Sequence, residues 1–127
     1  MKYRTPLGVA RGRGSAHNGT AHWFAQRLTA LALIPLGLAA AVLFFWLMRT
    51  GYYPVFALMH RPWVLLFAVL LVAVVYWHGY LGLKVVIEDY VHRPLLAFAC
   101  ITLVRFLSVA LALLGIIAAV MVGFRSF

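Results

Sequence analysis

Long apolar runs separated by short polar links dominate this chain and predict three membrane-spanning helices. The runs cover about residues 28–48, 63–87 and 104–124. About 20 apolar residues in a helix are enough to cross a hydrocarbon core of roughly 30 Å. Residues 1–20 are polar, basic and glycine-rich, and they are expected to form an irregular arm. The pattern predicts an all-α membrane protein, with an arm at 1–20 and a three-helix membrane region at 21–127.

The third apolar stretch, residues 95–124, is longer than one crossing needs and contains Arg105. We place Arg105 near a membrane interface. Residues 95–104 then lie along the surface or extend the helix beyond the core. An arginine inside a span can be functional, but a long side chain that reaches the interface is the favoured interpretation.

Composition and charge agree with a membrane location. The chain has 127 residues, of which 66% are hydrophobic and 10% are charged. A soluble domain of this size could not bury so many apolar side chains. The net charge of +9 arises from basic residues that flank the apolar runs. It therefore indicates membrane topology and contact with anionic lipids rather than binding to nucleic acid.

The distribution of Lys and Arg predicts the orientation. Basic residues are concentrated in the N-terminal arm and in the link after the second run, so both should face the cytoplasm. The first apolar run is long enough to span and does not resemble a cleaved signal. We expect a bacterial inner-membrane protein without a leader. The single cysteine, Cys100, cannot form an internal disulfide and favours apolar packing.

The stretch from Tyr76 to Tyr90 carries the candidate chemistry. It contains the only two acidic residues of the chain, Glu88 and Asp89, and the histidine deepest in an apolar run, His78. On a helix, one stripe of side chains collects the following residues: His78, Gly82, Val85 and Asp89. The stripe would run from near mid-bilayer to the cytoplasmic surface, over roughly 16 Å.

His78 supports two interpretations. A neutral imidazole is a good ligand for haem iron, and small residues beside it, Gly79 and Gly82, would allow a flat macrocycle to approach. Alternatively, His78 hydrogen-bonds a neighbouring helix and the glycines mediate helix packing. The residues alone do not decide between them. The other histidines lie in the arm or the links and offer no second axial ligand: His17, His22, His60 and His92.

Asp89 and Tyr90 also support two interpretations. A carboxylate at the membrane edge can relay protons and a phenol can hydrogen-bond a carbonyl, which is what quinone reduction requires. The alternative is purely structural, and without further context it is the better supported. Glu88 can pair with Lys84, Asp89 can contact Arg93, and Tyr90 can anchor the helix at the interface.

Two blocks of sequence resemble the small hydrophobic membrane-anchor subunit of succinate dehydrogenase, complex II. One is HGYLGLKVVIEDYV, residues 78–91, with a histidine, a nearby glycine and an Asp-Tyr pair eleven and twelve residues later. The other is GSAHNGTAHWFAQRLTALAL, residues 14–33. The three-span layout and the length are similar too, so the resemblance covers nearly the whole chain.

The resemblance implies roles for four residues. His78 would be an axial ligand of haem b, and the second axial histidine would come from a second membrane anchor that partners this one. Tyr90 would hydrogen-bond ubiquinone, and Asp89 would take part in its protonation. Arg27 would lie near the haem propionates. Ser15 and His17 receive no firm role, because that segment varies within the family.

The resemblance also implies a place in a larger complex. The chain would be a non-catalytic anchor in a heteromeric helix bundle, serving electron transfer from succinate to quinone in the tricarboxylic acid cycle and the respiratory chain. It has no glycine-rich dinucleotide motif and no cysteine cluster, so flavin and iron–sulfur centres would lie on a flavoprotein and an iron–sulfur protein. Two alternatives remain: a quinol:fumarate reductase anchor, and a non-redox membrane transporter or assembly protein.

Overall fold

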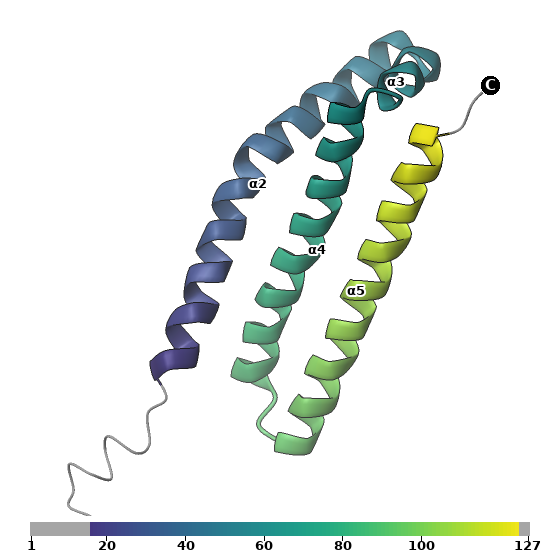
Figure 1. Ribbon diagram of the computed structural model, residues 1–127. Coiled ribbons are helices and arrows are strands. Elements are labelled where there is room, and N and C mark those ends of the chain that lie inside the picture. Colours follow the sequence, from purple (N-terminus) through teal and green to yellow (C-terminus); the bar gives the residue numbers. More distant parts are fainter. Residues whose placement is uncertain (1–15, 125–127) are drawn as a thin grey trace, which may run out of the picture.

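A computed structural model describes residues 16–124, and these residues form four helices and no strand (Figure 1). The helices are α2 (Ala16–Thr50), α3 (Tyr52–Met59), α4 (Pro62–Tyr90) and α5 (Pro94–Phe124). Three of them are long and apolar enough to cross a membrane. The prediction of an all-α protein with three long apolar helices is confirmed. The cytoplasmic location of the N-terminus stays a prediction, and Ser15 lies outside the described residues.

Helices α4 and α5 form an antiparallel pair (Figure 1). Two glycines of α5 allow the close approach. A Cβ atom added at Gly115 would lie 3.0 Å from Val72 Cγ1, and one at Gly123 would lie 3.2 Å from the methyl carbons of Leu65. Small residues at helix contacts let backbones approach in a membrane, where the hydrophobic effect does not drive helices together. Close van der Waals packing between the two helices therefore holds the pair together.

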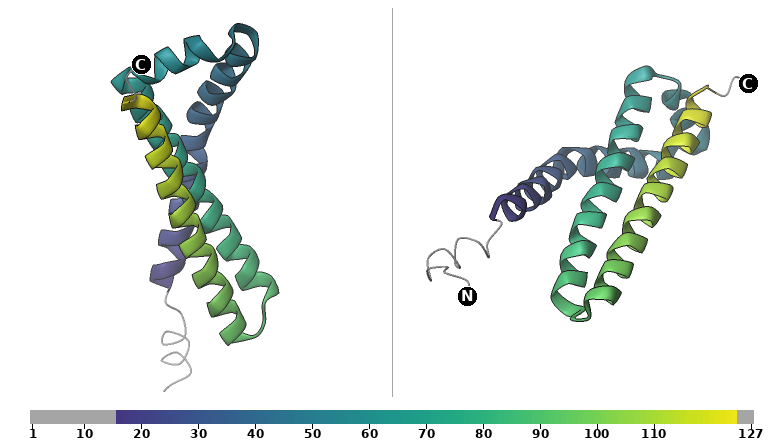
Figure 2. Two further views of the ribbon diagram at one scale, coloured as in Figure 1. Left: turned by 90° about the vertical axis from the view of Figure 1, so that its right-hand side faces the viewer. Right: turned by 60° about the horizontal axis from the view of Figure 1, so that its bottom comes forward.

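Helix α2 packs on α4 through its N-terminal half and diverges from it towards its C-terminal end (Figure 2). Helix α3 bridges the resulting gap, after a turn at Gly51 with a positive φ of 81°. The sequence pattern treated residues 49–62 as a simple link and missed this short helix. Pro54 does not prevent it, because proline is tolerated in the first turn.

One further helix boundary differs from the sequence-based expectation, and another decides between two alternatives that the sequence left open. Helix α2 begins at Ala16, so the irregular arm expected up to residue 20 is already helical in its last residues. Helix α5 is continuous from Pro94, so residues 95–104 extend the helix and do not lie along the surface as a separate segment. Proline at the start of both α4 and α5 suits the first turn of a helix, which has no partner for its N–H groups.

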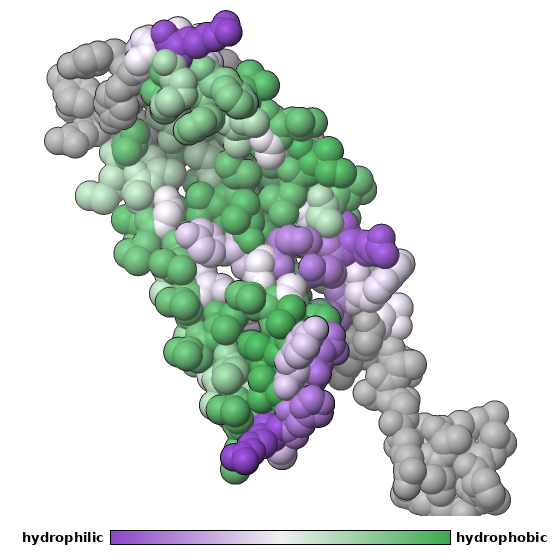
Figure 3. Space-filling view, turned by 180° about the vertical axis from the view of Figure 1, so that it is seen from behind, coloured by the Kyte–Doolittle hydropathy of each residue, from purple (hydrophilic) through white to green (hydrophobic). Residues whose placement is uncertain are grey.

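The described chain has almost no interior of its own. Leu81, with 4% of its surface exposed, is the one buried hydrophobic residue among the residues described. Large apolar side chains cover the surface, and polar side chains gather at the two ends and beside the N-terminal part of α2 (Figure 3). Such a surface needs lipid or other helices around it.

Candidate functional site

His78 is held by a side chain of helix α2. Its Nδ1 atom lies 2.9 Å from Oγ1 of Thr29. The same hydroxyl oxygen lies 2.8 Å from the carbonyl oxygen of Ala25, four residues earlier, and 3.1 Å from that of Gln26. His78 and Thr29 are both partly buried between α2 and α4. The histidine ring is thus fixed at the contact between the two helices.

These contacts indicate the tautomer of His78. The Thr29 hydroxyl has one proton, and a backbone carbonyl can only accept. Both close contacts are satisfied when the hydroxyl donates to the carbonyl of Ala25 and accepts Nδ1–H of His78. The proton of the neutral ring is then on Nδ1. Its Nε2 lone pair, which makes no hydrogen bond within residues 16–124, is left for another partner.

The two glycines near His78 have different surroundings. A Cβ atom at Gly82 would lie 3.7 Å from Nε2 of Gln26, so Gly82 belongs to the α2–α4 contact. A Cβ atom at Gly79 would meet nothing within 4 Å. One glycine therefore serves helix packing, as the structural interpretation predicts. The other leaves open space beside the histidine, as a cofactor would require.

Helix α2 carries a polar stripe that sequence reasoning missed. His22, Gln26 and Thr29 are spaced at i, i+4 and i+7 and face α4. Nε2 of His22 and Oε1 of Gln26 are buried without a hydrogen-bond partner. Buried polar atoms normally have partners, so these two are exceptions among the described residues. The helical spacing in the N-terminal block was a signal that could have revealed the stripe.

Arg27 does not touch His78. Its side chain is exposed, and its guanidinium lies 5.5 Å from the ring centroid of Trp23, one turn earlier on α2. Arg27 is two residues from Thr29, which turns it roughly 200° around the helix. The structure therefore brings Thr29 to His78 and leaves Arg27 on the outer face of α2.

Three cations lie near one level of the bundle. The Gln26–Gly82 contact places Arg27 at the level of Gly82. The antiparallel register of α4 and α5 brings Arg105 to a similar level, and Lys84 follows two residues farther along α4. Charged side chains prefer the membrane interface. The haem-ligand candidate, His78, lies four residues before Gly82, about 6 Å along the axis from this level.

Asp89 and Tyr90 lie at the exposed end of α4. Tyr90 has 78% of its surface exposed. Within the described residues, the Asp89 side chain makes no ion pair or hydrogen bond, and the expected contact with Arg93 is absent. The expected pair between Lys84 and Glu88 is present, with Nζ and Oε1 3.7 Å apart. Of the two carboxylates, only that of Glu88 has a structural partner.

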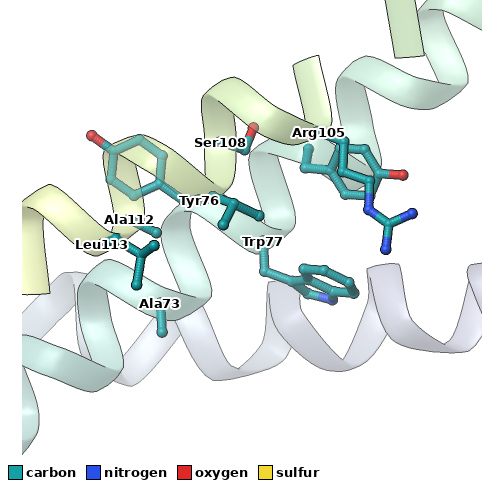
Figure 4. A pocket seen from close by; sticks show the side chains of 9 residues that line it. Ala73, Tyr76, Trp77, Arg105, Ser108, Ala112 and Leu113 are labelled. Carbon is teal, nitrogen blue, oxygen red and sulfur yellow. The ribbon is translucent and has the colours of Figure 1, made fainter. Parts of the chain in front are cut away.

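A shallow cavity of about 160 Å³ lies between α4 and α5 (Figure 4). Its lining is mostly apolar and aromatic, with Arg105 and Ser108 as the polar contributors from α5. The rings of Trp77 and Tyr80 lie against each other there, with centroids 5.6 Å apart. Arg105 is exposed and makes no ion pair within residues 16–124, which agrees with a side chain that reaches the interface.

The described residues contain no group of three or more His, Cys, Asp or Glu side chains that could hold a metal ion. Haem does not require such a group, because the porphyrin supplies four nitrogen ligands and each protein residue supplies one axial position. His78 fits that requirement by its free Nε2 and by the open space at Gly79. A second axial ligand would have to come from outside the described residues.

Comparison with known proteins points to one family. The profile of the succinate dehydrogenase/fumarate reductase transmembrane subunit family matches residues 1–122. The succinate dehydrogenase hydrophobic membrane anchor subunit of Paracoccus denitrificans is 33% identical over 90 residues, which are 71% of this chain and 70% of that protein. The subunit of the same name from Rickettsia bellii (strain RML369-C) is 32% identical over 118 residues, or 91% and 93% of the two chains. No solved structure matches the chain significantly.

Proposed function

Since this chain belongs to the succinate dehydrogenase/fumarate reductase transmembrane subunit family, we propose that it forms half of a haem b site and part of a ubiquinone-reduction site. Its family makes it a membrane anchor that associates with the other subunits of such an enzyme. Three apolar helices and the likeness to bacterial anchors fit a multi-pass inner-membrane protein of bacteria, as predicted.

The observation that carries the haem proposal is the hydrogen bond from His78 to Thr29. It occupies Nδ1 and leaves Nε2 with a lone pair, which is the state that binds iron. Haem bound there would supply a one-electron redox centre. The second membrane anchor of the complex would supply the other axial histidine, because no other histidine of this chain is placed beside His78 in the described residues.

The level of the cations supports the same proposal. Haem carries two propionates, and Arg27 lies on α2 two residues from Thr29, about 3 Å along the helix axis from the level of His78. A guanidinium binds carboxylates well. Arg27 would turn from the Trp23 ring towards a propionate in the assembled complex. The unpartnered Nε2 of His22 and Oε1 of Gln26 add polar groups on the inner face of α2.

Asp89 and Tyr90 support the quinone proposal by their accessibility. The phenol of Tyr90 can donate a hydrogen bond to a quinone carbonyl, and the carboxylate of Asp89 can pass protons from water. Both side chains are exposed at the end of α4, and neither is engaged within the described chain. Electrons would arrive from an iron–sulfur protein, which a flavoprotein that oxidises succinate would reduce. This chain would not oxidise succinate itself.

The test of the proposal is the haem spectrum of the purified complex. Replacing His78 by Ala should abolish or shift the b-type absorbance of the reduced complex. His60→Ala is the matched control, because His60 bonds the carbonyl oxygen of Gly123, at the end of the α4–α5 pair away from His78. An unchanged spectrum in the His78 variant, or no b-type absorbance in a wild-type complex that contains the partner anchor, would contradict the haem assignment.

A further inference from the structure

We propose that Thr29 is a positioning residue for the haem: its hydroxyl accepts Nδ1–H of His78 and so aims Nε2 of the ring at the iron. This inference rests on the proposed haem site. It adds a residue of helix α2 to a site whose ligand is on helix α4. The observation that supports this role is the 2.9 Å distance between Thr29 Oγ1 and His78 Nδ1.

Thr29 is suited to this task because its hydroxyl is itself fixed. Oγ1 lies 2.8 Å from the carbonyl oxygen of Ala25, so the hydroxyl proton points back along α2. The lone pairs then point away from the helix, towards the histidine. A β-branched side chain in a helix has few χ1 conformations, which reduces the entropy lost in holding the contact. The acceptor is therefore oriented before haem binds.

The chemistry of the acceptor matters as much as its position. A carboxylate would draw the Nδ1 proton strongly and give the ring imidazolate character. The hydroxyl of Thr29 is neutral, so the ring stays a neutral imidazole with its proton on Nδ1. Without the hydroxyl, Nδ1–H would lose its partner in a partly buried contact, and the ring could rotate or change tautomer. Both changes would weaken the bond from Nε2 to iron.

No other side chain in the described chain takes this role. Gln26 is the nearest polar neighbour on α2, but its amide faces Gly82, one turn along α4. Its Oε1 is buried without a partner and does not bond the histidine. Thr29 alone among the described residues joins His78 to helix α2 by a hydrogen bond.

The experiment compares three variants of the complete complex, purified with its partner subunits. Thr29→Val keeps the shape and removes the hydroxyl, and Thr29→Ser keeps the hydroxyl. Thr50→Val is the matched control, because Thr50 makes the same bond to a carbonyl, 2.8 Å to the oxygen of Trp46, without a histidine partner. The readouts are the haem content per complex, the rate of haem loss to an excess of a haem-free globin, and the low-temperature electron paramagnetic resonance spectrum.

Thr29→Val should bind haem roughly 10- to 100-fold more weakly, the range found when the partner of a metal-bound histidine is removed. Its low-spin haem signal should shift. Thr29→Ser should restore both properties, and Thr50→Val should match the wild type. If Thr29→Val does not assemble, Thr29→Ala removes the hydroxyl without added bulk and is judged by the same readouts.

Wild-type haem affinity and an unshifted signal in Thr29→Val or Thr29→Ala would overturn the inference. Failure of Thr29→Ser to restore the signal would overturn it too, because then the hydroxyl is not the group that matters. The His78→Ala variant separates this outcome from failure of the proposed function. If His78→Ala loses haem and Thr29→Val does not, only the role of Thr29 is wrong. If His78→Ala keeps its spectrum, the haem site itself is wrong.

Discussion

The two ends of the stripe from His78 to Asp89 on helix α4 differ in how much of their surroundings this chain supplies. At one end, His78 is partly buried, packed against α2 and fixed by a hydrogen bond to Thr29. At the other end, Asp89 and Tyr90 are exposed and make no side-chain bond within residues 16–124. The two candidate half-sites are therefore prepared to different degrees before any partner binds.

The difference has a geometric cause. Helix α2 crosses α4 near His78 and diverges from it beyond the crossing, so the C-terminal end of α4 lies away from α2 (Figure 2). A residue at the crossing gains a partner from α2, and a residue beyond the crossing does not. The difference teaches that the proposed histidine ligand would be oriented inside one subunit, whereas the proposed quinone site would have to be completed by another chain.

The largest effect at the exposed end is expected from Asp89. Because general acid–base groups typically contribute 10²–10⁴-fold, Asp89→Asn should lower quinone reduction by at least about 100-fold. Succinate oxidation with a water-soluble artificial acceptor should change little, and so should the haem spectrum. The matched control is Glu88→Gln, the neighbouring carboxylate that already pairs with Lys84. Equal loss of both activities would show that Asp89 supports assembly, not proton transfer.

A smaller effect is expected from Tyr90. Tyr90→Phe removes one hydrogen-bond donor and keeps the ring, and one such bond contributes about 0.5–1.5 kcal/mol. Quinone reduction should therefore fall by roughly 2- to 12-fold, with the haem spectrum unchanged. Tyr80→Phe is the control on the same helix, since Tyr80 lies against Trp77 in the α4–α5 cavity. A haem spectrum altered by Tyr90→Phe would mean that the two ends of α4 are not independent.

The sequence predicts the three long helices of this molecule well. Runs of about 20 apolar residues fix three long helices, because a membrane leaves few other conformations for such segments. Helical periodicity also places His78 and Gly82 on one face correctly, and both meet α2. The sequence pattern did not predict the short helix α3, because eight residues with an internal proline carry little periodic signal.

The partner of His78 could not be predicted from the sequence. Periodicity indicates which residues of α2 share a face, but not where α2 crosses α4. That crossing depends on side chains along the whole contact, and it decides that Thr29, not Gln26 or His22, meets the histidine. For Asp89 and Tyr90 the described chain adds no side-chain partner to what the sequence already shows, and under the proposed function their partners would belong to other chains.

The smallest effect is expected from the ion pair near the exposed end of α4. It allows Glu88, which has a partner, to be compared with Asp89, which has none within the described residues. Lys84 and Glu88 are exposed to 30% and 50% and lie 3.7 Å apart at i, i+4. Such a pair contributes about 0.3–0.5 kcal/mol, because water screens it. Glu88→Gln should therefore change quinone reduction less than about 2-fold and leave the thermal stability of the complex within error. A loss as large as that of Asp89→Asn would reverse the assignment, since Glu88 would then be the carboxylate that serves the quinone. The acid without a structural partner is the one expected to be free for chemistry.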